Sequence, residues 1–215
     1  MICHQNIIFG FRRLSAYRVA PALRTVILLL ATCGSGVGTV HAGDTLSIQL
    51  AKGSDSEETA RVQLVRLVDQ FDVEQWLFTE KVMIDDSQWI PHSHPVLTLN
   101  SRYLDDDLSQ LATFLHEQFH WYAGTRQERI DAAISDFKAM FPEVPSGRVG
   151  ARDEYSTYLH LIICDLELAA MQKLVGDAEA RRVLGQWQHY TWIYDQVLNN
   201  SAVRAINEYH ELTPP

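Results

Sequence analysis

The segment of residues 107–123 limits the fold more than any other, because its pattern requires an amphipathic helix. Its apolar positions are Leu108, Leu111, Leu115, Phe119 and Tyr122. Three aspartates at positions 105–107 suit the positive end of a helix, and Gly124 suits its end. His116 and His120 are four residues apart within this segment, so both imidazoles extend from one face of the helix.

The residues between these two histidines indicate metal chemistry. The stretch reads His116-Glu117-Gln118-Phe119-His120, which is H-E-x-x-H. Two histidines one helical turn apart can bind one zinc ion, and Glu117 then lies beside the water that completes the coordination. A capped amphipathic helix around the motif favours a metal site over a chance match in a chain with nine histidines.

This combination resembles the zincin metallopeptidases, and the glutamate-type zincins most closely. Strands are expected at residues 76–84 and 94–100, directly before the motif helix. The resemblance implies that an edge strand lies beside the metal and pairs with an extended peptide substrate. It also implies that Glu117 is the general base of a zinc-dependent peptidase. Residues 157–161 and 190–194 are similar to segments of uncharacterised bacterial H-E-x-x-H proteins.

A third metal ligand is expected from a later helix, because a catalytic zinc ion usually has three protein ligands. The segment of residues 150–167 offers Glu154, His160 and Glu167. The resemblance favours Glu154, since a glutamate opens the ligand helix of the glutamate zincins. Tyr158 departs from that pattern, because those enzymes place there an aspartate that orients the first histidine. His160 would give a three-histidine site, and Glu167 lies two turns beyond it.

The preferred assignment makes His116, His120 and Glu154 the metal ligands, with Glu117 and His160 as catalytic residues. One of the three candidates for the third ligand can instead be an outer partner of the site or a donor to the transition state. Aromatic residues at positions 189–194, in a helix expected over residues 177–199, are more typical of packing. Tyr190 or Tyr194 could still donate to a developing oxyanion.

The first 42 residues have the pattern of a signal peptide. Four arginines precede a short apolar stretch at residues 26–31, and Val40-His41-Ala42 suits cleavage. The alternative is a lipoprotein signal, with lipid attached at Cys33 after Leu30-Ala31-Thr32. Either pattern predicts an exported bacterial protein, periplasmic or extracellular, with no membrane-spanning helix.

Removal of residues 1–42 leaves 173 of the 215 residues, which is enough for one domain with a buried core. Four of the 18 basic residues lie in the removed part, so 14 remain against 27 acidic residues. The resulting net charge of −13 argues against nucleic acid and anionic membranes as partners. Cys164 is then the one remaining cysteine, so no internal disulfide can form.

The expected fold class is α+β, with a small antiparallel or mixed sheet and several helices around the motif helix. Residues 43–215 are expected to form a single zincin-like metallohydrolase domain. The leading hypothesis is a zinc-dependent hydrolase that cleaves peptides or proteins. The first alternative is an exported metal-binding protein without catalytic activity, acting as an interaction module. The second is an acidic binding domain in which the motif is accidental.

Overall fold

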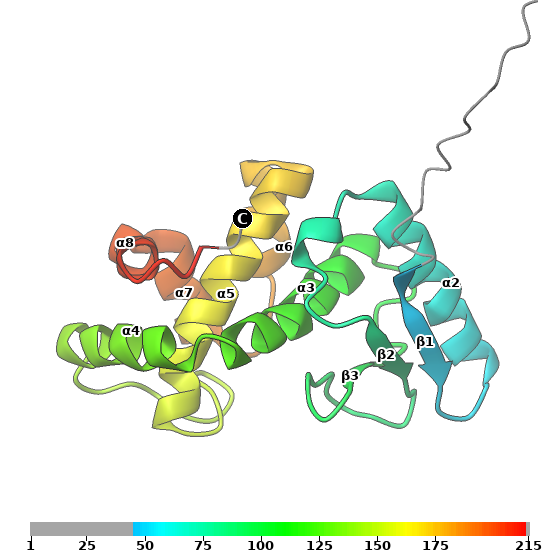
Figure 1. Ribbon diagram of the computed structural model, residues 1–215, viewed down its shortest axis with the longest axis horizontal. Helices are drawn as coiled ribbons and strands as arrows, with labels where there is room; N and C mark the ends of the chain where they lie inside the picture. The colour runs from blue at the N-terminus through cyan, green and yellow to red at the C-terminus, as the bar shows by residue number, and fades with distance from the viewer. Residues whose placement is uncertain (1–44, 214–215) are drawn as a thin grey trace, which may run out of the picture. The chain divides into compact units, whose positions relative to one another are not determined.

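The computed structural model describes residues 45–213, and its α+β fold confirms the predicted class (Figure 1). Within these residues there are seven α-helices, three strands and one 3-10 turn. Their bounds are β1 Ser47–Leu50, α2 Asp55–Gln70, η1 Glu74–Trp76, β2 Lys81–Ile84, β3 Leu97–Leu99, α3 Asp107–Gly124, α4 Gln127–Met140, α5 Glu154–Val175, α6 Asp177–Gly185, α7 Thr191–Asn199 and α8 Ser201–Tyr209. The predicted signal peptide and the lipid site at Cys33 lie outside the described residues.

The sheet has the order β1-β2-β3, and both strand pairings are parallel rather than antiparallel or mixed as predicted. The parallel direction of β1 and β2 follows from their connection, because α2 returns the chain to the end of the sheet where β1 began. The strand predicted over residues 76–84 is extended only in β2, and its first residue belongs to η1. The strand predicted over residues 94–100 is limited to β3. An isolated antiparallel bridge joins His92 to Thr98 on β3.

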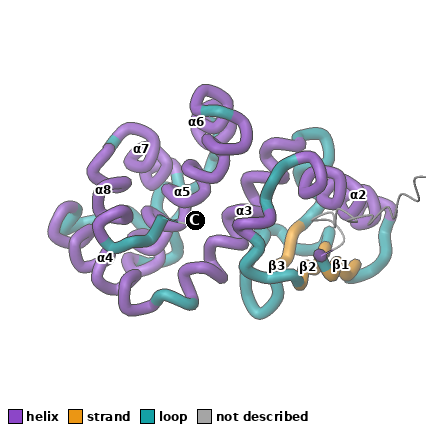
Figure 2. The backbone as a smooth tube through the Cα atoms, turned by 45° about the horizontal axis from the view of Figure 1, so that its top comes forward, coloured by secondary structure: helices purple, strands orange, loops and turns teal. Residues whose placement is uncertain are grey.

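Helix α3 separates two parts of the structure. Figure 2 shows the strands and α2 on one side of α3, and α4 to α8 on the other. Helix α5 packs along α3 and contacts α4, α6, α7 and α8 as well, so it forms the centre of the helical part. It is apolar around most of its circumference, as expected of a helix buried on all sides. Within residues 45–213, no helix combines the length and hydropathy needed to cross a membrane.

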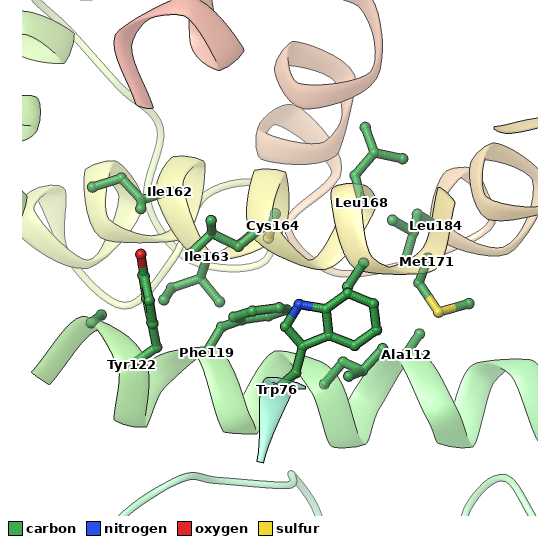
Figure 3. Close-up of a cluster of buried hydrophobic side chains, with 14 of the residues drawn as sticks. Trp76, Ala112, Phe119, Tyr122, Ile162, Ile163, Cys164, Leu168, Met171 and Leu184 are labelled. Atoms are coloured by element: carbon green, nitrogen blue, oxygen red, sulfur yellow. The ribbon is translucent and has the colours of Figure 1, made fainter. Parts of the chain in front are cut away.

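The hydrophobic core fills the contact between α3 and α5. Figure 3 shows Trp76, Phe119 and Tyr122 on the side of α5 that carries Ile163. Cys164 is fully buried and forms no disulfide with another described residue. Because α3 and α5 share this apolar contact, polar side chains on the same two helices are held in a fixed relation to each other.

The single helix predicted over residues 177–199 is in fact two helices, α6 and α7. Helix α6 ends at Gly185, and Tyr190 precedes α7 in the left-handed region with a φ of 55°. A glycine weakens a helix and a left-handed residue cannot continue one, so the chain turns here. The turn of residues 186–190 brings His189 and Tyr190 to the side of the motif helix.

Candidate metal centre

Three histidines from two helices form a cluster. Helix α3 contributes His116 and His120, and α5 contributes His160. The ring centroids are separated by 5.2 Å for His116 and His120, 5.5 Å for His116 and His160, and 5.0 Å for His120 and His160. One ring nitrogen of each lies within 4.8 Å of the other two. These side chains could therefore hold a metal ion.

The hydrogen bonds of the rings orient the cluster for a metal. The Nδ1 atom of His160 donates to the carbonyl oxygen of Ser156 at 2.6 Å, which leaves Nε2 as the acceptor nitrogen. The Nδ1 atom of His116 lies 2.9 Å from Oε2 of Glu167. For His120, neither ring nitrogen hydrogen-bonds to a residue of the described range. Metal-binding histidines use one nitrogen for an outer oxygen and the other for the metal, and His116 and His160 fit that rule.

Glu167 is the outer partner of His116. Its side chain is buried, with 1% exposed, and Oε2 also accepts a hydrogen bond of 2.8 Å from the Tyr194 hydroxyl. Glu167 thereby orients the first histidine, the task that the resemblance assigns to an aspartate at position 158. The hydroxyl of Tyr158 instead donates to the carbonyl oxygen of Phe141 at 2.6 Å.

A second set of side chains, His116, Cys164 and Glu167, is also close enough to share an ion. In this set the Glu167 carboxylate is already bound to the His116 ring and the Tyr194 hydroxyl. Burial raises the pKa of the Cys164 thiol well above its usual value, which disfavours the thiolate that a metal requires. The three-histidine set is therefore the better candidate.

Burial keeps the histidines neutral, which is the form that binds a metal. It lowers the pKa of His116 to about 4 and that of His160 to about 3. Burial also raises the pKa of Glu117 to about 8, and the charge of Glu167 adds to this effect. A metal ion held by the three imidazoles would lower the pKa of Glu117 again, because its positive charge would stabilise the ionised carboxylate.

Glu154, the preferred third ligand in the sequence analysis, does not join the cluster. Helix α5 does begin at this residue, as predicted. Its side chain, however, is 64% exposed and lies 3.4 Å from Nζ of Lys138. Six residues along an ideal helix correspond to a rotation of roughly 240° beyond one full turn, so Glu154 and His160 face different directions. His160 therefore replaces Glu154 in the candidate ligand set, and is a ligand candidate rather than a separate catalytic donor.

Of the three histidines, His116 lines a cavity of about 840 Å³, together with Glu117 and Tyr190. The Tyr190 ring lies with its centroid 4.4 Å from that of His160 and 6.1 Å from that of His116. Its hydroxyl makes no hydrogen bond to another residue of the 45–213 range, whereas the hydroxyl of Tyr194 is bound to Glu167. Of the two predicted oxyanion donors, Tyr190 is thus the one with a hydroxyl available.

The cavity wall is built from two loops that hydrogen-bond to each other. The backbone N–H of Tyr190 donates to the Arg148 carbonyl oxygen at 2.8 Å, and that of Trp192 donates to Val149 at 3.0 Å. Gly150 is required in this wall, since a Cβ atom there would lie 2.0 Å from the carbonyl oxygen of Pro145. These contacts hold Tyr190 in its left-handed conformation.

Two further lining residues, Arg102 and Arg148, were not singled out by the sequence analysis. Both lie in loops, where no periodic pattern indicates which way a side chain faces.

Comparison with known proteins adds no assignment to this site. No family model matches the chain, and searches of curated proteins and of solved structures gave no match.

Proposed function

We propose that this protein is a zinc-dependent hydrolase that cleaves peptide bonds. The observation that supports this most strongly is that His116 and Glu117 line one cavity, while His120 and His160 each bring a ring nitrogen within 4.8 Å of one of His116. Three protein ligands leave a coordination position for water or substrate, as in catalytic zinc sites, whereas structural sites are closed by four. The cavity beside the cluster favours the enzyme over the interaction module.

In this proposal His116, His120 and His160 hold the ion, and Glu167 and the Ser156 carbonyl fix the rings of His116 and His160. Imidazole ligands suit zinc, although copper, nickel and iron also accept them, so the identity of the metal is part of the proposal. A bound zinc ion supplies Lewis acidity, which polarises a carbonyl group and makes water more acidic.

The protein groups around the cluster supply the proton transfers. Glu117, one residue after the first histidine, accepts a proton from the attacking water and passes it to the leaving amine. The Tyr190 hydroxyl donates a hydrogen bond to the oxyanion that develops on the former carbonyl oxygen. Both groups line the same cavity, so one bound peptide can reach both.

The test combines metal content with hydrolysis. The protein is purified without chelator, its metal is measured by elemental mass spectrometry, and cleavage of a peptide mixture is followed by mass spectrometry. We expect about one zinc per chain. Glu117→Gln keeps the metal and slows cleavage by roughly 10²- to 10⁴-fold, the usual contribution of a general base. Glu154→Gln, which changes an exposed carboxylate on the same helix as His160, is the matched control.

Three outcomes contradict the proposal in different ways. Full activity of Glu117→Gln removes the assigned general base. Absence of stoichiometric metal from the wild-type protein removes the metal centre. Stoichiometric metal without any cleavage by the wild-type protein supports the alternative, a metal-binding module without catalytic activity.

A further inference from the structure

We infer that Arg102 and Arg148 bind a carboxylate of the substrate beside the metal centre. The inference rests on the proposed function, because it takes the substrate to be a peptide. It concerns how the protein recognises that peptide, and it is tested by measuring peptide affinity. It gives the substrate class as peptides with an acidic side chain near the scissile bond or with a free C-terminal carboxylate close to it.

The charges that line the cavity are distributed unequally. Three arginines, at positions 102, 148 and 152, line it together with two carboxylates, Glu117 and Glu167. Both carboxylates are buried at the metal centre, and Glu167 is bound to His116 and Tyr194. Arg152 pairs with Asp153 at 3.0 Å. Arg102 and Arg148 form no ion pair with any residue of the described range, in a chain with 27 acidic and 18 basic residues.

Arg148 is fixed in position but leaves its terminal nitrogens available. Its Nε donates to the carbonyl oxygen of Gln188 at 2.7 Å, and its own carbonyl oxygen accepts from the N–H of Tyr190. Neither Nη atom hydrogen-bonds to another residue between 45 and 213. A guanidinium held in this way is suited to a carboxylate, because two parallel N–H groups can bind the two oxygens.

Arg102 adds a second charge next to an exposed apolar surface. Its Nη2 donates to the carbonyl oxygen of Trp89 at 2.5 Å, and its guanidinium carbon lies 5.2 Å from the Trp89 ring centroid. Trp89 and Ile90 line the same cavity and are 81% and 66% exposed. Arg102 therefore also supports the Trp89 loop, so Arg148 is the more informative residue to replace.

The two arginines act on the same region of the cavity. Arg102 and Arg148 line the cavity that His116, Glu117 and His189 also line. A carboxylate bound by these arginines would therefore lie in the same cavity as His116, with the exposed Trp89 and Ile90 in its wall. The carboxylate of a side chain and that of a C-terminus are alike in charge and geometry, so the experiment has to distinguish these two sources.

The experiment measures peptide affinity in the zinc-loaded full chain carrying Glu117→Gln, in which slow turnover does not disturb binding. Three fluorescein-labelled peptides differ at one place: a central Gln with an amidated C-terminus, a central Glu with an amidated C-terminus, and a central Gln with a free C-terminus. Fluorescence anisotropy gives the dissociation constants. We expect one of the two carboxylate peptides to bind roughly tenfold tighter than the neutral one. Which of them does so identifies the source of the carboxylate.

Added to this parent, Arg148→Gln should abolish the preference while leaving the affinity for the neutral peptide unchanged. Arg148→Lys keeps the charge without the planar fork, and we expect it to retain part of the preference. Arg61→Gln removes the same charge from the exposed face of α2 and is the matched control. Salt at about 0.5 M should weaken the preference of the parent, which tests the charge independently of any arginine substitution.

Equal affinity of the parent for all three peptides, or no binding of any of them, would overturn the inference. A preference that survives both Arg148→Gln and Arg102→Gln would overturn it as well. The hydrolysis assay is separate from this result. A carboxylate preference that depends on Arg148, in a wild-type protein that cleaves nothing, would refute the proposed function and leave the binding site in place.

Discussion

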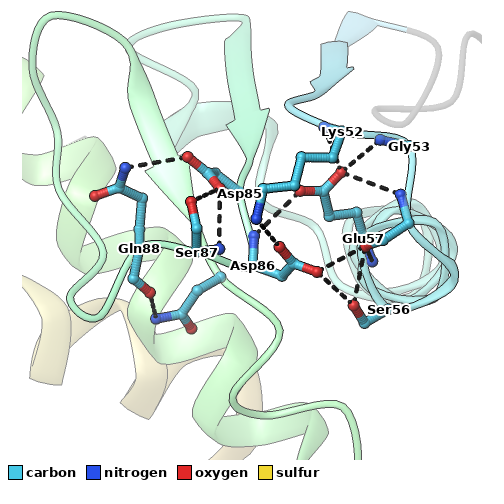
Figure 4. A network of polar contacts seen from close by, with 10 residues as sticks. Lys52, Gly53, Ser56, Glu57, Asp85, Asp86, Ser87 and Gln88 are labelled. Atoms are coloured by element: carbon cyan, nitrogen blue, oxygen red, sulfur yellow. Dashed lines mark hydrogen bonds and ion pairs between the residues drawn. The ribbon is translucent and has the colours of Figure 1, made fainter.

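Two clusters of potential metal ligands in this protein differ in how their polar atoms are satisfied. The first is the three-histidine centre. The second, which we call the sheet-end network, comprises Glu57, Asp85 and Asp86 and lies where β1 and β2 end (Figure 4). Each cluster brings three ligand atoms within 4.8 Å of one another. Distance alone therefore does not separate them.

The sheet-end network satisfies its own oxygens. Glu57 accepts hydrogen bonds from the backbone N–H groups of Lys52 at 2.9 Å, Gly53 at 2.8 Å and Asp86 at 3.2 Å. Asp86 accepts from the Lys52 ammonium at 2.9 Å and from the hydroxyls of Ser54 at 2.8 Å and Ser56 at 2.9 Å. At the histidine centre only the Nδ1 atoms of His116 and His160 are paired, and the other ring nitrogens of the three histidines have no hydrogen-bond partner among the described residues. Unpaired atoms that face inward, rather than proximity, distinguish a metal site from a structural network.

The largest difference between the clusters is expected in metal affinity. We predict that His116→Ala, His120→Ala and His160→Ala each weaken zinc binding by roughly a thousandfold. A thousandfold change corresponds to about 4 kcal/mol, which is roughly one third of the 10–16 kcal/mol of binding free energy at a protein zinc site. Glu57→Gln should leave the affinity unchanged. Competition with a chromogenic zinc chelator measures both, and zinc loss in the Glu57 variant alone would reverse the comparison.

A smaller effect is predicted for the outer partner of the centre. Glu167→Gln keeps the size of the side chain but removes the charge opposite His116, so zinc affinity should fall by roughly 10- to 100-fold. The same chelator competition measures it, with Glu154→Gln as the control on the same helix. An unchanged affinity in Glu167→Gln would show that the contact between His116 and Glu167 does not support the metal.

The sheet-end network is expected to affect stability instead of metal binding. Glu57→Ala leaves four backbone N–H groups without their acceptor and removes the capping box of α2. We predict that the melting temperature falls by roughly 5 °C. Glu58→Ala, an exposed residue of the same helix, is the control. Scanning calorimetry of the metal-free protein gives both values, and equal melting temperatures for the two variants would contradict the structural role.

The smallest predicted effect concerns acid. The Lys52 ammonium, together with the Ser54 and Ser56 hydroxyls, lowers the pKa of Asp86 to about 2. A carboxyl whose folded pKa is below its unfolded value stabilises the fold above about pH 4, and the contribution is lost as the pH falls to about 2. We expect wild-type stability to exceed that of Asp86→Asn above pH 4, and the two curves to converge near pH 2. Urea unfolding across this range measures the difference, and parallel curves would contradict the assignment.

Local sequence was sufficient to predict the motif helix, but not the ligand set. Helix α3 lies at Asp107–Gly124, close to the predicted residues 107–123, because its caps and apolar stripe are local features. The direction of His160 and Glu154 depends on the rotation of α5 about its axis. That rotation is decided by packing, since α5 is apolar on several sides and its sequence does not mark one inner face.

The remaining parts of the site depend on contacts between distant segments. The turn at residues 186–190 was predicted as helix, although Gly185 could have indicated a boundary. The position of Tyr190 depends on hydrogen bonds to the loop that contains Arg148, 42 residues earlier in the chain. The sequence offers Glu167 as one of three alternatives for the third ligand, and the contact of α3 with α5 places it beside His116.

The bond from Tyr194 to Glu167 has a consequence for the order in which the protein matures. A nascent chain that ends before α7 already contains all three histidines, but Glu167 would lack the hydroxyl that helps to hold it against His116. Such an intermediate should capture zinc weakly and exchange it readily. If the centre binds zinc as proposed, retention of the ion begins when α7 docks, and metal loading then reports on completion of the C-terminal helices.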